Sequence, residues 1–302
     1  MSLKTKPAGI KQTRGDRIVG WIINLILILM SICALYPIYF VIIASFSDPF
    51  AVARGEVLFL PKGINLSAYE KLWGDIRIWT GYRNSLFYTV VGTILSLICT
   101  LPAGYALSRP KLFLRRPLSL FFVFTMYFSG GTVPSYIVLR NMGMINTIWA
   151  ILLPNVVTVF NLIIVRSFFE GSIPEALYEA AFIDGCSHFR FFASVVIPLS
   201  PAIIAVMVLY YGLALWNAYF EPMIYVSNEK IQTLQVIMKS VTATPDYSTA
   251  ENVSAEMLVE LIRTKALVKY AIVVVASVPM LLLYPFVQRF FIQGVMVGAV
   301  KG

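Results

Sequence analysis

The apolar residues of this chain fall into six long runs that contain no charged side chain. Each run is close to or above the roughly 20 residues that a helix needs to cross about 30 Å of hydrocarbon. Because lipid offers no hydrogen-bond partners to the backbone, such runs are expected to be helical. The pattern predicts an all-α, polytopic membrane protein with six transmembrane helices. The runs cover residues 18–46, 84–108, 117–139, 141–165, 191–220 and 270–288.

The fifth run is too long for one crossing, and its helix is expected to enter the bilayer only near Pro201. The first run follows a basic segment, but its apolar stretch is about twice the length found in signal peptides. We therefore interpret it as a retained first span. The expected organisation is a cytoplasmic tail, residues 1–17, followed by a single transmembrane domain, residues 18–302. Its spans are expected at about 18–46, 84–108, 117–139, 141–165, 201–225 and 270–290.

The basic residues indicate the orientation in the membrane. With the N-terminus in the cytoplasm, the inner segments hold 13 of the 24 Lys and Arg residues and five of the 15 acids. The outer segments then hold 11 basic and ten acidic residues. This bias agrees with the positive-inside rule and places both termini in the cytoplasm. The net charge of +9 is therefore a topology signal, and nucleic-acid binding is not expected.

The composition also narrows the function. The chain is 59% hydrophobic and only 13% charged, and the middles of the expected spans hold no ionisable residue of the kind that ion-coupled transporters use. It contains no phosphate-binding loop of the G-x-x-x-x-G-K-[ST] type, and its three cysteines show no metal-ligand spacing. No metal, cofactor or enzymatic activity is expected of this chain. If it moves a solute uphill, a partner must supply the energy.

A polar segment, residues 171–201, separates two of the apolar runs. A charge at mid-bilayer would cost roughly 3 kcal/mol, so this segment must lie in water or against protein. Ser172 and Glu175 form a capping-box pattern, and Gly185 supplies a stop, which predicts a helix of about 12 residues. Ser187 is expected to cap a second short helix. The segment and its flanks hold five charges within 21 positions: Glu170, Glu175, Glu179, Asp184 and Arg190.

Two explanations fit this segment. It is either an amphipathic helix on the inner leaflet or a shaped plug that fits a groove in another protein. Anionic lipid would repel its acids. Ala176 and Ala180, four residues apart, form a small-residue face that another surface can approach closely. The acids, and the sharp glycine turn that leads at once into a second short helix, favour the plug.

Here the residues resemble a known family. Glu179-Ala180-Ala181 with Asp184-Gly185, followed by Ile197-Pro198-Leu199, is similar to the EAA loop of ABC importer permeases. Asn84-Ser85-Leu86 and Tyr105-Ala106-Leu107-Ser108-Arg109 are similar to the carbohydrate group of these permeases. Further segments resemble the polysaccharide and oligosaccharide branch, which includes the alginate and pectin-oligosaccharide importers. They are Phe128-Ser129-Gly130-Gly131, residues 141–147 and the tail 294–302.

The resemblance implies a type I ABC importer permease fold in which residues 169–199 form a cytoplasmic coupling loop. In that family the loop docks in a cleft of the ATPase subunit, and Glu179 would face a basic residue there. Asp184 would be either a second contact or a helix-end hydrogen-bonding group, and Gly185 would set the turn. The tail 294–302 either reaches the ATPase pair or is a frayed terminus. The residues expected to couple to the ATPase are Glu175, Glu179, Ala180, Ala181, Asp184 and Gly185.

A solute path through charge-free spans must be built from polar and aromatic side chains. Aromatic rings stack on the C–H faces of sugars, and amides orient their hydroxyl groups. The alternative for Trp and Tyr near a span end is an interfacial belt. A break at 129–132 in the third span either lines a cavity or packs closely against a helix. The path candidates are Tyr211, Trp216, Asn217, Tyr219, Gly130 and Gly131.

The resemblance predicts a multi-pass, non-catalytic subunit of the bacterial cell membrane. It implies a second permease subunit, two ATPase subunits that hold ATP and Mg²⁺, an extracytoplasmic solute-binding protein and an oligosaccharide substrate. The outer segments, 47–83 and 226–269, would receive the binding protein or pack on the sister permease. Alternatives are a permease for an amino acid or another small solute, a channel or scaffold without an ATPase partner, and a lipid-modifying enzyme.

Overall fold

A computed structural model of the protein describes residues 14–242, 266, 268–283 and 285. Its regular elements in this part of the chain are helices, so the fold is all-α, as the sequence predicts. The chain divides into two compact units, residues 1–69 with 251–274 and residues 70–250 with 275–302. Most of the expected N-terminal tail, the tail 294–302 and the end of the expected sixth span lie outside the described residues.

The first unit is dominated by one long apolar helix, α1 (Arg14–Ser45). Nearly all of its side chains are exposed up to residue 42, which suits a helix that faces lipid. The connection that follows contains the short α2 (Pro49–Ala53) and is closed by hydrogen bonds. The Asn65 N–H donates to the Phe46 carbonyl at 2.9 Å, and the Ser45 and Tyr69 hydroxyls lie 2.7 Å apart. These contacts order the polar chain beyond the end of α1.

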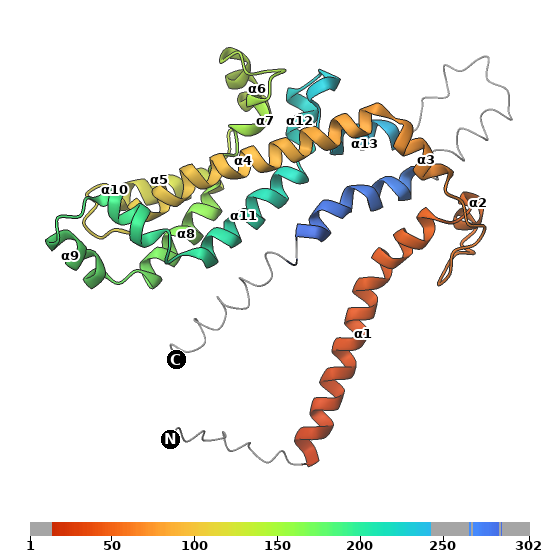
Figure 1. The fold of residues 1–302 in the computed structure, drawn as a ribbon, viewed down its shortest axis with the longest axis horizontal. Helices are drawn as coiled ribbons and strands as arrows, with labels where there is room; N and C mark the ends of the chain where they lie inside the picture. Colours follow the sequence, from red (N-terminus) through yellow and green to blue (C-terminus); the bar gives the residue numbers. More distant parts are fainter. Residues whose placement is uncertain (1–13, 243–265, 267, 284, 286–302) are drawn as a thin grey trace. The chain divides into compact units, whose positions relative to one another are not determined.

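The second unit is built around α4 (Ile76–Ser108). Helices α8 (Val159–Ser172), α11 (Pro201–Trp216) and α13 (Leu234–Thr242) pack against it (Figure 1). Glycine permits two of these close approaches. A Cβ at Gly104 would lie 2.5 Å from Val165 Cγ1, and a Cβ at Gly81 would lie 2.7 Å from Ile237 Cδ1. Both distances are too short for a side chain.

The residues Asn84-Ser85 hold the turn η2 (Glu229–Ile231) and the start of α13 against α4. The Asn84 amide donates to the carbonyls of Lys230 and Gln232 at 2.9 and 3.0 Å. The Ser85 hydroxyl accepts from the Leu234 N–H at 2.8 Å. These side chains satisfy three backbone groups of residues 230–234, among them that of the buried Leu234.

The expected spans are not all straight helices. Helices α5 (Arg115–Tyr127) and α6 (Thr132–Asn141) meet at 114° across the expected break. Helix α10 (His188–Phe191), with the π-helical turn η1 (Phe192–Val196), meets α11 at 89°. Two described helices, α1 and α4, are long and apolar enough to span a membrane, or up to four spans if each bent pair is one. The six-span count stays a prediction.

The fourth and fifth expected spans are also interrupted. Residues 141–165 contain the end of α6, the short α7 (Trp149–Leu152) and the start of α8, with non-helical residues between them. Helix α11 starts at Pro201, where the sequence places the entry of the fifth span, and ends at Trp216. A separate short helix, α12 (Phe220–Tyr225), follows. A shorter apolar helix, Val268–Leu283, overlaps most of the sixth run.

Candidate functional site

The polar segment folds as two short helices, as the sequence predicts, but its start differs from the expected capping box. Ser172 is the last residue of α8, and Pro174 occupies the N-cap of α9 (Glu175–Ile183) without a side-chain cap. The capping-box prediction is therefore wrong. Pro174 explains the break, because a residue before proline avoids the helical region, and Ile173 is extended, with φ −112° and ψ 97°.

The other end of α9 matches the expectation for Gly185. This glycine has φ +78°, its N–H donates to the Phe182 carbonyl, and the Cys186 N–H donates to the Ala181 carbonyl, both at 3.0 Å. These two bonds form a Schellman motif, in which glycine is favoured because a side chain is strained at positive φ. The Ser187 hydroxyl then caps α10 by accepting from the Arg190 N–H at 3.3 Å.

Two basic residues that follow α4 contact the acids of α9. Arg109 Nη1 lies 3.5 Å from Glu175 Oε2. Lys111 Nζ lies 3.9 Å from Glu175 Oε1 and 3.8 Å from Glu179 Oε1. Arg109 is almost buried, lies over the Tyr105 ring and reaches the Phe169 carbonyl on α8. Helix α9 is therefore linked by ion pairs to the end of α4, and Arg109 also joins that end to α8 through the Phe169 carbonyl.

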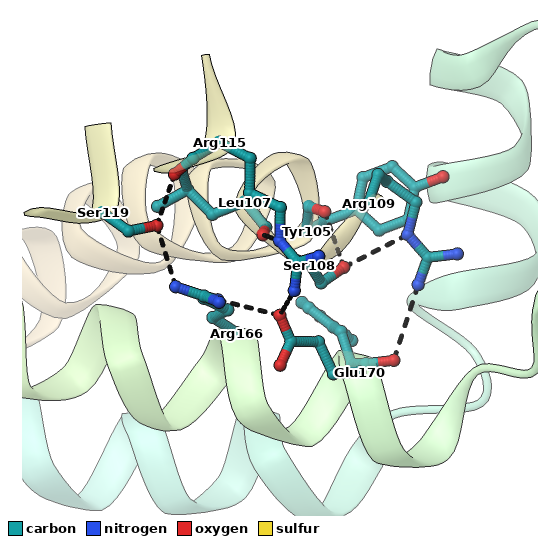
Figure 2. A network of polar contacts seen from close by, with 9 residues as sticks. Tyr105, Leu107, Ser108, Arg109, Arg115, Ser119, Arg166 and Glu170 are labelled. Atoms are coloured by element: carbon teal, nitrogen blue, oxygen red, sulfur yellow. Dashed lines mark hydrogen bonds and ion pairs between the residues drawn. The ribbon is translucent and has the colours of Figure 1, made fainter. Parts of the chain in front are cut away.

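A second polar network ties the same ends of α4, α5 and α8 together. Figure 2 shows Glu170 of α8 lying between two guanidinium groups, those of Arg115 on α5 and Arg166 on α8. Arg166 also donates to the Ser119 hydroxyl at 2.8 Å, and Arg115 donates to the Leu107 carbonyl at 3.1 Å. Partial burial disfavours the Glu170 carboxylate, but the hydrogen bonds from Arg166 and Arg115 outweigh it and lower its pKa.

The remaining surface of the loop is apolar and exposed. Ala176 and Ala180 are exposed, as the small-residue face requires. Ile183 is 85% exposed and Phe189 is 80% exposed. Ala176, Ala180 and Ile183 are spaced four and three residues apart and so share one face of α9, while Phe189 is exposed on α10. Asp184, at the C-cap of α9, is exposed, and Ala181 is half-buried.

A second region of the same unit contains a cavity of about 720 Å³ between α7–α8 and α11–α12. Three of the expected path residues line it: Tyr211, Asn217 and Tyr219. The Tyr211 hydroxyl is already engaged, because it lies 2.7 Å from Thr100 Oγ1 and accepts from the Thr158 N–H. Asn217 is exposed, and its Nδ2 donates to the Leu213 carbonyl at 2.9 Å, which leaves its Oδ1 available in the cavity lining beside the half-buried Tyr219.

The other expected path residues lie elsewhere. Trp216 is 1% exposed, and its indole N–H donates to the Ala276 carbonyl at 3.1 Å. It packs edge-on against Tyr82 and is not among the residues that line the cavity. Gly130 and Gly131 form the exposed break between α5 and α6, also outside the cavity lining. Gly131 has φ +85°, which explains the glycine at that position.

Residues 76–297 match the family of binding-protein-dependent transport system inner membrane components. This chain belongs to that family. It is therefore a membrane-embedded permease subunit of an ABC importer and not the ATPase, and the resemblance seen in the sequence is confirmed.

Individual relatives align over nearly the whole permease. The polygalacturonan/rhamnogalacturonan transport system permease protein YtcP of Bacillus subtilis (strain 168) is 34% identical, over 95% of this chain and 99% of that protein. Protein LplC of the same organism is 34% identical, over 88% of this chain and 89% of that protein. A chain from the crystal structure of a bacterial ABC transporter involved in the import of the acidic polysaccharide alginate is also similar. It has a TM-score of 0.81 at 34% identity, and the match covers 93% of this chain and 99% of that one.

Sequence reasoning missed several residues of both regions of the permease. It used Lys111 and Arg115 only as basic residues that indicate orientation, and Arg109 for that purpose and as the last residue of the Tyr105–Arg109 motif, although each forms an ion pair with Glu170, Glu175 or Glu179. The basic residues at 109–116 and the acids at 170–184, which the sequence places on the same side of the membrane, were a signal that could have suggested this pairing. The polar residues Asn155, Thr158 and Asn161 of the cavity lining were also missed. They lie within the fourth apolar run, and polar side chains inside an otherwise apolar run are the signal that could have indicated them.

Proposed function

We propose that this permease subunit imports an oligosaccharide delivered by an extracytoplasmic binding protein, in the cytoplasmic membrane of a bacterium. It would act with a second, related permease subunit and two ATPase subunits. The relatives named for polygalacturonan, rhamnogalacturonan and alginate support the sugar class. The proposed topology has six spans in one domain, residues 18–302, with both termini in the cytoplasm.

Residues 169–199 are proposed to dock on an ATPase subunit. The observation that carries this proposal is the exposed surface of the two short helices: Ala176, Ala180 and Ile183 are exposed on α9, and Phe189 is exposed on α10. Small side chains allow a partner to approach closely, and large apolar side chains gain free energy when a partner covers them. Glu179 is 58% exposed, and a basic residue of that partner would compete with Lys111 for its carboxylate.

The ion pairs of the loop suggest how a push on α9 would reach the spans. Arg109 links α9 to the end of α4, and Glu170 links α8 to α5. ATP and Mg²⁺, bound by the partner subunits, supply the free energy. We propose that the linked ends of α4, α5, α8 and α9 then move together. The spans would thereby alternate between inward-facing and outward-facing states.

The solute path is proposed to include the cavity between α7–α8 and α11–α12. Asn217, Tyr219 and Asn155 present amide and hydroxyl groups there, and Tyr210 presents an aromatic ring. This mixture suits sugars, which need aromatic faces and hydrogen-bonding groups together. Trp216 is better explained as a packing residue, because it is buried against Tyr82 and Ala276. The outer segments, 47–83 and 226–269, are proposed to receive the binding protein.

The test is ATP hydrolysis by the complex purified through a tag on this chain and reconstituted with its binding protein. We expect one member of a panel of neutral and acidic oligosaccharides to stimulate hydrolysis. The Ile183→Ser and Phe189→Ser variants should weaken recovery of the ATPase, while the control Phe113→Ser, which changes an equally exposed residue of the α4–α5 loop, should not. Stimulation by an amino acid alone would contradict the sugar, and a complex without ATPase would contradict the docking proposal.

A further inference from the structure

The cavity between α7–α8 and α11–α12 is rich in uncharged polar groups. Among the residues that the structure describes, its lining contains one charged side chain, Glu221, and no Lys or Arg. Glu221 lies in the first turn of α12 and is half-buried. Its Oε1 accepts from the Asn155 amide at 3.4 Å, and none of the ion pairs among the described residues includes it. The described lining of the cavity therefore presents an anion without a neighbouring cation.

This charge pattern bears on which sugars can enter. The carboxylate of a uronate is best bound by the forked guanidinium of Arg or by the ammonium of Lys. In this cavity it would instead meet a carboxylate, in surroundings where partial removal of water strengthens repulsion. Neutral sugars have no such penalty, because their hydroxyl groups can donate to Glu221 and accept from Asn155.

Building on the proposed oligosaccharide import, we infer that Glu221 determines specificity: this cavity accepts neutral oligosaccharides and disfavours those made of uronates. The inference separates this chain from its relatives named for polygalacturonan and alginate, which are acidic polymers. Like charges placed across a binding site are an effective means of excluding the wrong ligand.

The test compares two ligands of the same length that differ in charge, trigalacturonate and its fully methyl-esterified form. Binding to the transporter complex in nanodiscs, without the binding protein, is measured by saturation-transfer NMR, so that the binding protein's own selectivity does not enter. We expect the native complex to bind the ester about three- to tenfold more tightly at low salt, with the difference shrinking as salt screens the charges. In Glu221→Gln, which keeps the size of the side chain and its contact with Asn155, the difference should fall below about twofold.

Glu229→Gln is the matched control, because it removes the same charge from an exposed turn outside the cavity lining. It should leave the native preference unchanged. Equal or tighter binding of the uronate by the native complex would overturn the inference, and so would an undiminished difference in Glu221→Gln. If neither ligand nor any neutral oligosaccharide bound, the proposed sugar path itself would be contradicted, which is a different result from binding without discrimination by charge.

Discussion

Lys111 Nζ lies 3.8 Å from Oε1 of Glu179, so the acid expected to face the ATPase has a partner within its own chain. Both side chains are exposed, Lys111 at 69% and Glu179 at 58%. Exposed ion pairs of this kind contribute about 0–1 kcal/mol. Such a weak pair orients the Glu179 side chain, but a basic residue of a partner can displace Lys111 from it.

Glu179→Gln and Lys111→Gln separate these two roles. If Glu179 contacts the ATPase, Glu179→Gln should lower substrate-stimulated ATP hydrolysis several-fold, while Lys111→Gln should lower it less than about twofold. Neither variant should change the thermal midpoint by more than a few degrees, because the intramolecular pair is exposed. Equal loss of coupling in both variants would show instead that the intramolecular pair is what matters.

Gly185→Asp should reduce coupled transport while the protein stays in the membrane. A Cβ at this position would meet no atom within 4 Å, so the cost comes from the positive φ, at about 1–2 kcal/mol for a residue with a side chain. That strain would change the direction in which the chain leaves α9. Gly171→Ala is the matched control, because Gly171 lies within α8 and its Cβ would also meet open space. Vesicle transport that is unchanged in Gly185→Asp would contradict the proposed role of the turn.

The sequence predicted the features of the loop that depend on local chemistry. Gly185 and Ser187 act within a few residues of their own position, so their patterns could be read directly. The predicted capping box does not form because α8 extends through Ser172, and the next helix begins only after Pro174. Contacts between distant segments, such as that of Arg109 with Glu175, depend on how the helices pack. The order of charged residues along the sequence indicates them only weakly.

The sequence could not show which of the expected solute-path residues line the cavity, for a similar reason. Trp216 and Asn217 are neighbours in sequence, but they point to different surroundings because successive residues of a helix lie about 100° apart. Hydropathy cannot say which of them faces a cavity. The same holds for the interrupted fourth run, where the apolar composition of residues 141–165 conceals non-helical residues between α6, α7 and α8.

Gly104→Ala should destabilise the packing of α4 against α8. The new Cβ would lie 2.5 Å from Val165 Cγ1 and 3.2 Å from the Arg166 backbone N, and backbone cannot move aside cheaply. Overpacking of this kind costs about 1–3 kcal/mol. Gly212→Ala is the control, because its Cβ would lie 3.8 Å from Thr89 and Thr93, an ordinary contact distance. Thermal melting in detergent should show a lower midpoint for Gly104→Ala alone, and equal midpoints would refute the close approach.

Glu170→Gln should loosen the ends of α5 and α8. The amide leaves Arg115 and Arg166 facing each other without an anion, and hydrogen bonds to charged groups contribute about 1.5–3 kcal/mol before discounting for exposure. With the carboxylate 33% exposed, we expect a loss of about 1 kcal/mol. Glu56→Gln is the control, because Glu56 contacts Arg54 and Lys62 only at an exposed site and at 3.6–3.7 Å.

The same carboxylate should give the stability a dependence on acid pH. The folded-state pKa of Glu170 is lowered, so its contribution is fully present above the ordinary glutamate pKa of about 4.3 and is lost as the pH falls through the lower, folded value. Melting of the native protein and of Glu170→Gln should therefore converge on acidification below about pH 4. A constant difference between the two proteins across that range would contradict the paired carboxylate.

Trp216→Phe and Asn217→Ala should affect different properties although the two residues are adjacent. Trp216→Phe removes the buried hydrogen bond to Ala276 and part of the contact with Tyr82, which should cost about 1–3 kcal/mol of stability. Asn217→Ala removes an exposed amide from the cavity wall, so it should raise the substrate concentration needed for half-maximal ATP hydrolysis and leave the melting midpoint within a few degrees of the native value. Paired measurements of melting and substrate dependence separate the two effects. If Trp216→Phe changed the substrate dependence strongly and left the stability unchanged, Trp216 would belong to the solute path after all.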